Sequence, residues 1–112
     1  MDKVLLKERI IHISNAINLI EGFVEKTSEA DFLVDIKLQS AVQYQFLIIG
    51  EAVKYLDISV LEKYNYPWHI PRSFRNFIIH KYHGVKMERI FYASKDLNNL
   101  KEQINLILEN EF

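Results

Sequence analysis

Residues 6–24 read LKERIIHISNAINLIEGFV, and this stretch decides the fold class. Large apolar residues recur there at alternating steps of four and three positions, the repeat of one face of an α-helix. The stripe comprises Leu6, Ile10, Ile13, Ile17, Ile20 and Val24. It predicts one long helix over about residues 2–26 with this face in the core.

The same repeat returns near the C-terminus, in Ile90, Ala93, Leu97, Leu100, Ile104 and Ile107. It predicts a last helix from about Lys86 to about Asn110. The segments predicted in between are a turn at 27–29, a second helix over about 34–56 and a short helical turn over 60–64 capped by Ser59. A third helix is predicted with Pro71 in its first turn, running to about Tyr82 and stopping before Gly84.

No segment alternates apolar and polar residues over a sustained length, so a sheet is not expected. Long helices with short connections bury their apolar faces best as an up-and-down bundle. We therefore predict an all-α fold of four or five helices, as a single domain over residues 1–112. An apolar fraction of 49 % excludes disorder as the main state. A long helix in so small a domain leaves apolar surface to spare, which makes a homodimer plausible.

The composition also narrows the cellular setting. The chain has no Cys, which excludes disulfides and thiolate metal sites and fits a reducing compartment. No apolar run approaches the roughly 20 residues that span a bilayer. The N-terminal residues open a charged helical pattern rather than a signal peptide. We expect a soluble cytoplasmic domain.

Charge is distributed unevenly along the chain. Residues 63–89 contain six basic residues and one acidic residue, whereas the rest contains 8 basic and 14 acidic residues. Three of the four His residues lie in the same segment. Such a segment on an acidic body indicates a local anion site, with phosphate as the obvious ligand. Alternatively, these charges pair with the acidic body across helices.

Residues 67–85, PWHIPRSFRNFIIHKYHGV, concentrate the chemistry. Phe74, Phe77 and Ile78 are at helical spacing and are expected to face the core. The opposite side carries a guanidinium, an amide, an imidazole and a phenol within eight residues, namely Arg75, Asn76, His80 and Tyr82.

These groups suit phosphodiester cleavage without a metal. An imidazole with an ordinary pKa accepts a proton from a ribose 2′-hydroxyl near neutral pH, and a guanidinium binds the charged phosphate oxygens. Asn76 is expected to orient the imidazole or hold a phosphate oxygen. No carboxylate lies between Glu62 and Glu88, so this segment does not build a two-metal nuclease. The alternatives are plain surface hydrogen bonds, or a metal on His80 and His83, which lacks a third ligand.

The string Arg75-x4-His80-x-Tyr82 resembles the R-x4-H-x-Y motif of the HepT-like proteins, which belong to the HEPN superfamily of small helical domains. Gly50-Glu51-Ala52 and Pro67-Trp68 agree with that family in order and spacing, and the likeness covers nearly the whole chain. It implies the ribonuclease toxin of a type VII toxin–antitoxin pair, a homodimer that cleaves RNA without metal or cofactor.

The resemblance also assigns roles to single residues. Arg75 and His80 correspond to the catalytic pair, and Asn76 supports them. Tyr82 corresponds to the tyrosine onto which an MntA-like nucleotidyltransferase, the antitoxin, transfers AMP from ATP. Such a group would place bulk and negative charge two residues from His80.

Three further residues near the motif are expected to bind RNA, namely Arg72, Lys81 and His83. Lys81 stands where an acidic residue is common in the family, and its charge favours RNA binding. The second hypothesis is a non-catalytic helical partner that docks a nucleotidyltransferase through Tyr82 or the basic face.

Overall fold

A computed structural model describes residues 2–81 and 84–112. Every regular element in this part of the chain is an α-helix, which confirms the all-α prediction. In chain order the helices are α1 (Lys3–Val24), α2 (Glu29–Leu33), α3 (Ile36–Lys54), α4 (Ile58–Leu61), α5 (His69–His80), α6 (Met87–Ser94) and α7 (Asn98–Glu111). None of the described helices is long and apolar enough to cross a membrane.

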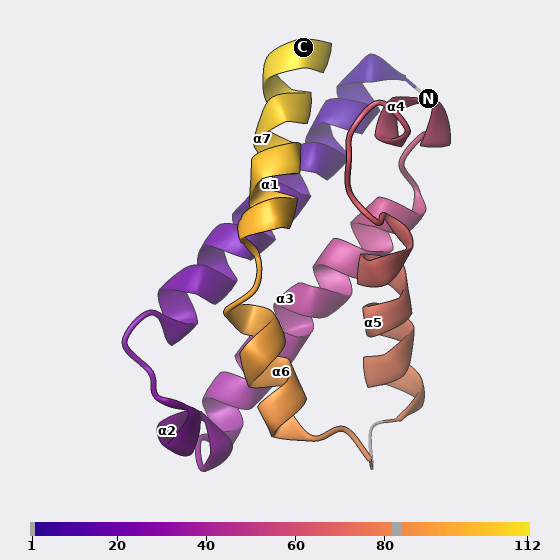
Figure 1. Cartoon of the computed structure of the whole chain (residues 1–112). Coiled ribbons are helices and arrows are strands. Elements are labelled where there is room, and N and C mark those ends of the chain that lie inside the picture. Colours follow the sequence, from indigo (N-terminus) through magenta and orange to yellow (C-terminus); the bar gives the residue numbers. More distant parts are fainter. Residues whose placement is uncertain (1, 82–83) are drawn as a thin grey trace.

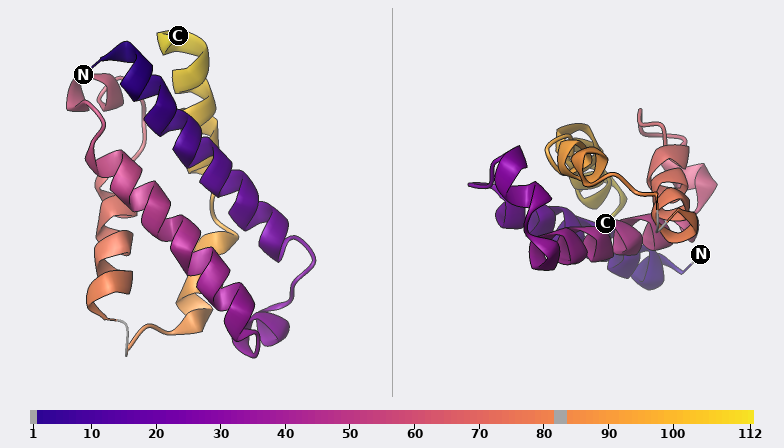
Figure 2. Two further views of the ribbon diagram at one scale, coloured as in Figure 1. Left: turned by 180° about the vertical axis from the view of Figure 1, so that it is seen from behind. Right: turned by 90° about the horizontal axis from the view of Figure 1, so that it is seen from below.

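The helices form four rows that run alternately up and down, as predicted for a bundle (Figure 1). The chain descends through α1, returns through α3, descends again through α5 and returns through α6 and α7, so both termini lie at the same end (Figure 1). Helix α3 is central, since it packs against α1 on one side and α5 on another (Figure 2). The two shortest helices, α2 and α4, lie at the connections.

The core consists of the apolar stripes that the sequence predicts. All six stripe residues of α1 are at most 5 % exposed, and α7 contributes Leu100, Ile104 and Ile107. Phe32, on the short helix α2, is fully buried against Phe91, with ring centroids 5.4 Å apart. Burial of these side chains drives folding, at about 25 cal/mol per Å² of apolar surface.

Side-chain caps mark three helix starts. The carboxylate of Asp2 accepts a hydrogen bond from the Val4 amide at 2.9 Å, and that of Asp35 accepts one from the Leu38 amide at 2.9 Å. The Ser28 hydroxyl accepts from the Asp31 amide at 3.1 Å. The predicted turn at 27–29 is displaced, because the connection after α1 covers residues 25–28 and Ser28 caps helix α2, which is not among the helices predicted from the sequence.

The predicted last helix is wrong in one respect, because it is broken between Ser94 and Asn98. The Ser94 hydroxyl is buried and donates to the Phe91 carbonyl, which competes with helix continuation. The Lys95 ammonium donates to the Val24 carbonyl at the C-terminus of α1, which draws the chain across to that helix. The apolar stripe still faces the core, since Leu97 is buried within the break.

Two other helix boundaries differ from the predictions. The short turn is α4, which follows Asp57 and not Ser59, and the second helix begins at Ile36, after its Asp35 cap. Helix α5 begins at His69, so Pro71 lies in its first turn as predicted, where a missing backbone N–H costs no intrahelical bond. Two single-turn helices and the broken last helix raise the number of described helices above the four or five expected.

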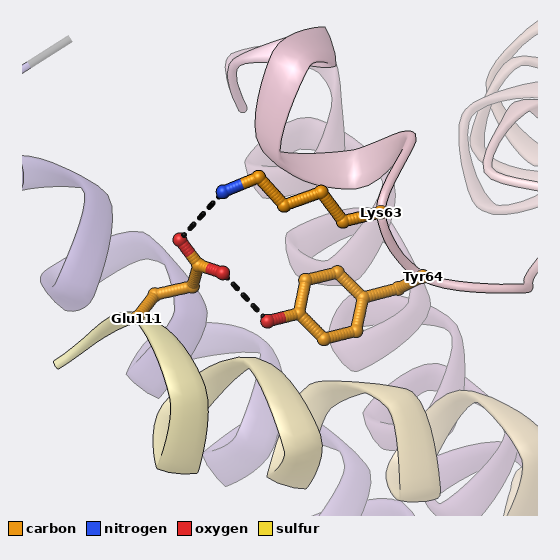
Figure 3. A network of polar contacts seen from close by, with 3 residues as sticks. All are labelled: Lys63, Tyr64 and Glu111. Atoms are coloured by element: carbon orange, nitrogen blue, oxygen red, sulfur yellow. Dashed lines mark hydrogen bonds and ion pairs between the residues drawn. The ribbon is translucent and has the colours of Figure 1, made fainter.

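A polar network anchors the segment that leads into α5 (Figure 3). The buried Tyr64 phenol donates to Glu111 of α7 at 2.7 Å, and the Lys63 ammonium lies 3.3 Å from the other oxygen of that carboxylate. Burial, followed by the bond to Glu111, raises the pKa of Tyr64 above its usual 10.0. The bond from Tyr64 lowers the pKa of Glu111 below its usual 4.5. The network ties this segment to the C-terminal helix.

Candidate nucleic-acid cleavage site

Helices α3 and α5 lie in close contact at Gly50. A Cβ atom at this buried position would lie 2.4 Å from the Arg75 Cβ and 2.7 Å from the Pro71 carbonyl oxygen. Both distances are well below carbon van der Waals contact, so only glycine permits this packing. Because position 50 has no side chain, the Cβ of Arg75 can lie directly against the α3 backbone.

Two neighbours then hold the Arg75 guanidinium. Its Nε lies 2.8 Å from Glu51 Oε2, and its Nη1 donates to Asn76 Oδ1 at 3.0 Å. The Arg75 side chain is 24 % exposed, so it is half-buried with one edge open. The contact with Glu51 is an ion pair, and the bond to Asn76 is the one hydrogen bond of the guanidinium within the described residues, so most of its five N–H donors remain for a ligand.

The structure places the predicted site residues in two groups. Arg75 and Asn76 are in direct contact, whereas His80 is exposed and makes no hydrogen bond or ion pair within the described part of the chain. Asn76 and His80 are four residues apart in α5 and therefore share one face of the helix. The Asn76 side-chain carbonyl accepts from Arg75, and the amide N–H groups of Asn76 have no partner in the described part of the chain.

The expected RNA-binding residues are exposed where the structure describes them. Arg72 lies one turn before Asn76 on the same face of α5, and Lys81 follows the last residue of the helix. Tyr82, the predicted modification site, and His83, the third predicted RNA-binding residue, lie outside the described residues.

The opposite side of α5 packs as predicted. Ile78 is buried, and the Phe74 ring meets Phe46 of α3 edge-on with centroids 4.9 Å apart. Phe77 is half-buried, and the Arg89 guanidinium lies over its ring at 4.4 Å. Apolar contacts on this side thus fix the rotation of α5 and turn its polar side outward.

Three residues of this region were missed among the predicted site residues. Glu51 belongs to the Gly50-Glu51-Ala52 string, so the sequence did signal its importance, although not its contact with Arg75. Arg9 and His12 of α1 line a cavity of about 390 Å³ together with Glu51 and Arg75. Nothing in the α1 sequence singles them out, because only the crossing of α1 over α3 brings them to the site.

The Arg9 side chain is held by a ring contact, while one of its N–H donors has no hydrogen-bond partner among the residues that the structure describes. Its guanidinium lies 5.0 Å from the centre of the Tyr55 ring, a cation–π contact that keeps the group over α3. Its Nε is buried and has no hydrogen-bond partner within the described residues. The cavity therefore contains two guanidinium groups and one carboxylate, and it favours an anion. No three His, Asp or Glu side chains gather closely enough to hold a metal in the part of the chain described.

Comparison with known proteins agrees with this arrangement. The family model for "Ribonuclease HepT-like" proteins matches residues 13–107. A Thermococcus cleftensis protein described as "Probable ribonuclease HepT" is 37 % identical over 98 residues, which cover 85 % of this chain and 88 % of that protein. A "Putative RNase" of Methanocaldococcus jannaschii is 35 % identical over 95 residues, covering 82 % of this chain and 78 % of that protein.

A longer relative contains a similar region. A Methanocaldococcus jannaschii protein described as "Gamma-glutamylcyclotransferase and putative RNase" is 40 % identical over 100 residues, which cover 88 % of this chain but only 45 % of that protein. No solved structure gives a significant match. The family model covers most of the chain, and of the residues described around Arg75 only Arg9 and His12 lie outside it. The chain therefore belongs to the HepT-like ribonuclease family.

Proposed function

We propose that this chain is a metal-independent endoribonuclease in which Arg75 and His80 act on the scissile phosphodiester. The fixation of the half-buried Arg75 side chain between Glu51 and Asn76 is the observation that carries the proposal. A guanidinium held in this way needs little rearrangement to bind phosphate, which is the condition for strong electrostatic stabilisation.

In the proposed reaction the His80 imidazole takes the proton of a ribose 2′-hydroxyl. The 2′-oxygen attacks the adjacent phosphorus, the bond from phosphorus to the 5′-oxygen breaks, and the leaving oxygen takes a proton from water or an acid. The products are a 2′,3′-cyclic phosphate and a 5′-hydroxyl. Arg75 stabilises the negative charge that builds on the phosphate oxygens.

The rate enhancement expected from each group can be stated as an order of magnitude. General-base catalysis by a positioned imidazole contributes typically about 10²–10⁴-fold. Loss of one preorganised donor to a developing oxyanion costs about 10²–10³ in rate. The free Asn76 amide is well placed to hold a phosphate oxygen beside Arg75. Arg72, Lys81 and His83 would bind the phosphates on either side, with an affinity that falls as salt rises.

The proposal includes a homodimer, supported by an apolar strip on the outer side of α1. At 100° per residue its members lie within about a third of the helix circumference. They are Val4, Leu5, Ile11, Leu19 and Phe23, each at least 37 % exposed. A second copy would cover them and add its own basic segment to the site.

The proposed setting is a cytoplasmic toxin of a type VII toxin–antitoxin pair. An MntA-like nucleotidyltransferase would neutralise it by joining AMP to the Tyr82 oxygen with release of pyrophosphate from ATP. The support is the position of Tyr82 two residues after His80, where an added phosphodiester would repel substrate phosphate. Incubation with ATP and the nucleotidyltransferase should add the mass of AMP to the wild type and not to Tyr82→Phe.

RNA cleavage by the purified protein in EDTA tests the enzymatic part. Intact mass first shows that Tyr82 is unmodified, because a modified sample would be inactive for that reason alone. We expect cleavage by the wild type and by the charge control Lys37→Ala, an exposed cation at the far end of α3. Arg75→Ala and His80→Ala should each lose at least about 100-fold.

Two outcomes would contradict the proposal. Cleavage that survives in both variants would move the chemistry away from Arg75 and His80. Absence of cleavage by unmodified protein on several RNAs would favour the non-catalytic partner of a nucleotidyltransferase instead.

A further inference from the structure

A cavity beside the candidate site provides neither of the reacting groups, Arg75 and His80, of the cleavage proposed above. Its volume is about 810 Å³, and it lies between the end of α3, the segment around α4 and the start of α5. Small-molecule sites are typically about 300–1,000 Å³, so the cavity has room for a nucleotide. Asn76, which contacts Arg75, is one of its lining residues.

Trp68 forms a rigid aromatic part of the lining. Its indole N–H donates to the Tyr64 carbonyl at 3.2 Å, and its ring lies 4.9 Å from the ring of Tyr66. Tyr64 is fixed in turn by its bond to Glu111 (Figure 3). The Trp68 ring is also partly buried against the core, so a base that stacked on it would meet an aromatic ring already fixed in position, as in stacking platforms for single-stranded nucleic acid.

Positive charge lines the same cavity. Lys54, Lys63 and Arg72 contribute three cations against the single carboxylate of Glu62. Lys63 is already paired with Glu111, whereas Arg72 is exposed and has no ion-pair partner in the described part of the chain. An unpaired guanidinium beside a fixed aromatic ring matches the two parts of a nucleotide, its phosphate and its base.

The lining of the cavity reaches Asn76, which shares one face of α5 with His80. Arg72, Asn76 and His80 are spaced four residues apart and so follow one face of the helix. At about 1.5 Å per residue, His80 lies about 12 Å along the axis from Arg72 and about 6 Å from Asn76. A nucleotide in the cavity would therefore be close in the RNA chain to a phosphodiester bound at Arg75 and His80.

We propose that this cavity binds one nucleotide of the RNA substrate near the cleavage point, with the base on Trp68 and a backbone phosphate on Arg72. The inference rests on the proposed ribonuclease function, and it names a substrate subsite outside the reacting groups. A nucleotide of an RNA chain fits better than a free mononucleotide, because Asn76 in the lining shares its helix face with His80.

The chain has one Trp, so its fluorescence reports directly on this cavity. We would titrate the full-length His80→Ala variant, which should not cleave, with a 2′-O-methyl RNA hexanucleotide, with AMP and UMP, and with inorganic phosphate. We expect saturable quenching by the hexanucleotide at the lowest concentration, weaker quenching by the mononucleotides and none by phosphate. Tighter binding of AMP than of the hexanucleotide would overturn the assignment to an RNA chain.

Arg72→Gln in the same background provides a variant that should not affect folding, because the side chain is exposed. It should weaken hexanucleotide binding about tenfold, a typical effect of losing one charged contact. Lys37→Gln is the matched control, since it removes an exposed cation at the opposite end of α3 and should leave binding unchanged. Equal losses in the two variants would contradict a specific role for Arg72.

Trp68→Leu tests the stacking with a fluorescently labelled hexanucleotide and anisotropy as the readout. Loss of one stacked base should weaken binding about five- to 150-fold, and Trp68→Phe, which retains an aromatic ring, should recover part of it. Cleavage that depends on Arg75 and His80 with no quenching at Trp68 would refute the subsite alone. Quenching without cleavage by the wild type would refute the ribonuclease function and retain a nucleotide site.

Discussion

Gly50→Ala is the sharpest test of how packing positions the site. The added methyl group would lie 2.4 Å from the Arg75 Cβ and 2.7 Å from the Pro71 carbonyl oxygen. Neither atom is the end of a flexible side chain, so the clash is relieved only by moving helix α5. To restore ordinary carbon contact of about 3.5 Å, the two helices must separate by about 1 Å at this point.

The energetic effect follows from two opposing contributions. Overpacking a well-packed position costs about 1–3 kcal/mol, whereas replacing Gly by Ala within a helix gains up to about 1 kcal/mol. Gly22→Ala in α1 provides the control, because a Cβ there meets nothing within 4 Å. Both variants gain helix propensity, so their difference isolates the steric cost at Gly50. At about 2.1 cal/mol/K of unfolding entropy per residue, that cost corresponds to Tm values about 4–12 °C apart.

Thermal unfolding followed by far-UV circular dichroism, at one protein concentration, measures the difference. RNA cleavage measures the second consequence, since a displaced α5 moves Arg75 away from Glu51. We expect Gly22→Ala to retain activity and Gly50→Ala to lose it along with stability. Equal melting temperatures for the two variants would refute the close approach of α3 and α5 at Gly50.

Three further predictions concern single contacts. Glu111→Gln should lower the free energy of unfolding at neutral pH, as measured by urea unfolding. The Tyr64 bond lowers the pKa of Glu111, so this carboxyl stabilises the fold only when it is ionised. The difference between variant and wild type should therefore shrink as the pH falls below 4.5. Arg75→Lys should lower RNA cleavage about tenfold or more, since a point charge cannot make the contacts to both Glu51 and a phosphate that a guanidinium makes. Asp35→Ala should cost about 1 kcal/mol in urea unfolding through loss of its N-terminal cap while cleavage stays unchanged.

The fold could be predicted because its main determinant is local. An apolar stripe at steps of three and four describes a helix face without knowledge of the partner, and all six stripe residues of α1 are buried. The break at Lys95 could not be predicted in this way. It depends on a bond to the carbonyl of Val24, 71 residues earlier in the chain, and the stripe itself continues unbroken through Leu97.

In the candidate site, too, the contacts within one helix could be predicted and the contacts between helices could not. Arg75 and Asn76 are adjacent in sequence, so helical geometry alone groups them on α5. The carboxylate of Glu51 and the cavity residues Arg9 and His12 come from other helices. Their arrival at Arg75 depends on how α1, α3 and α5 cross, which helical periodicity does not encode.

The adjacent residues Gly50 and Glu51 together position the Arg75 side chain. The missing side chain of Gly50 allows α5 to lie close enough that the Arg75 side chain starts directly over the α3 backbone. At that distance Glu51 Oε2 lies 2.8 Å from the Arg75 Nε, and of the two terminal nitrogens only Nη1 is bonded within the described residues, to Asn76. A larger residue at position 50 would lengthen the ion pair, and a neutral one at position 51 would free the guanidinium to rotate. The position of Arg75 in the proposed phosphate site thus depends on two residues of α3 that lie outside the R-x4-H-x-Y motif.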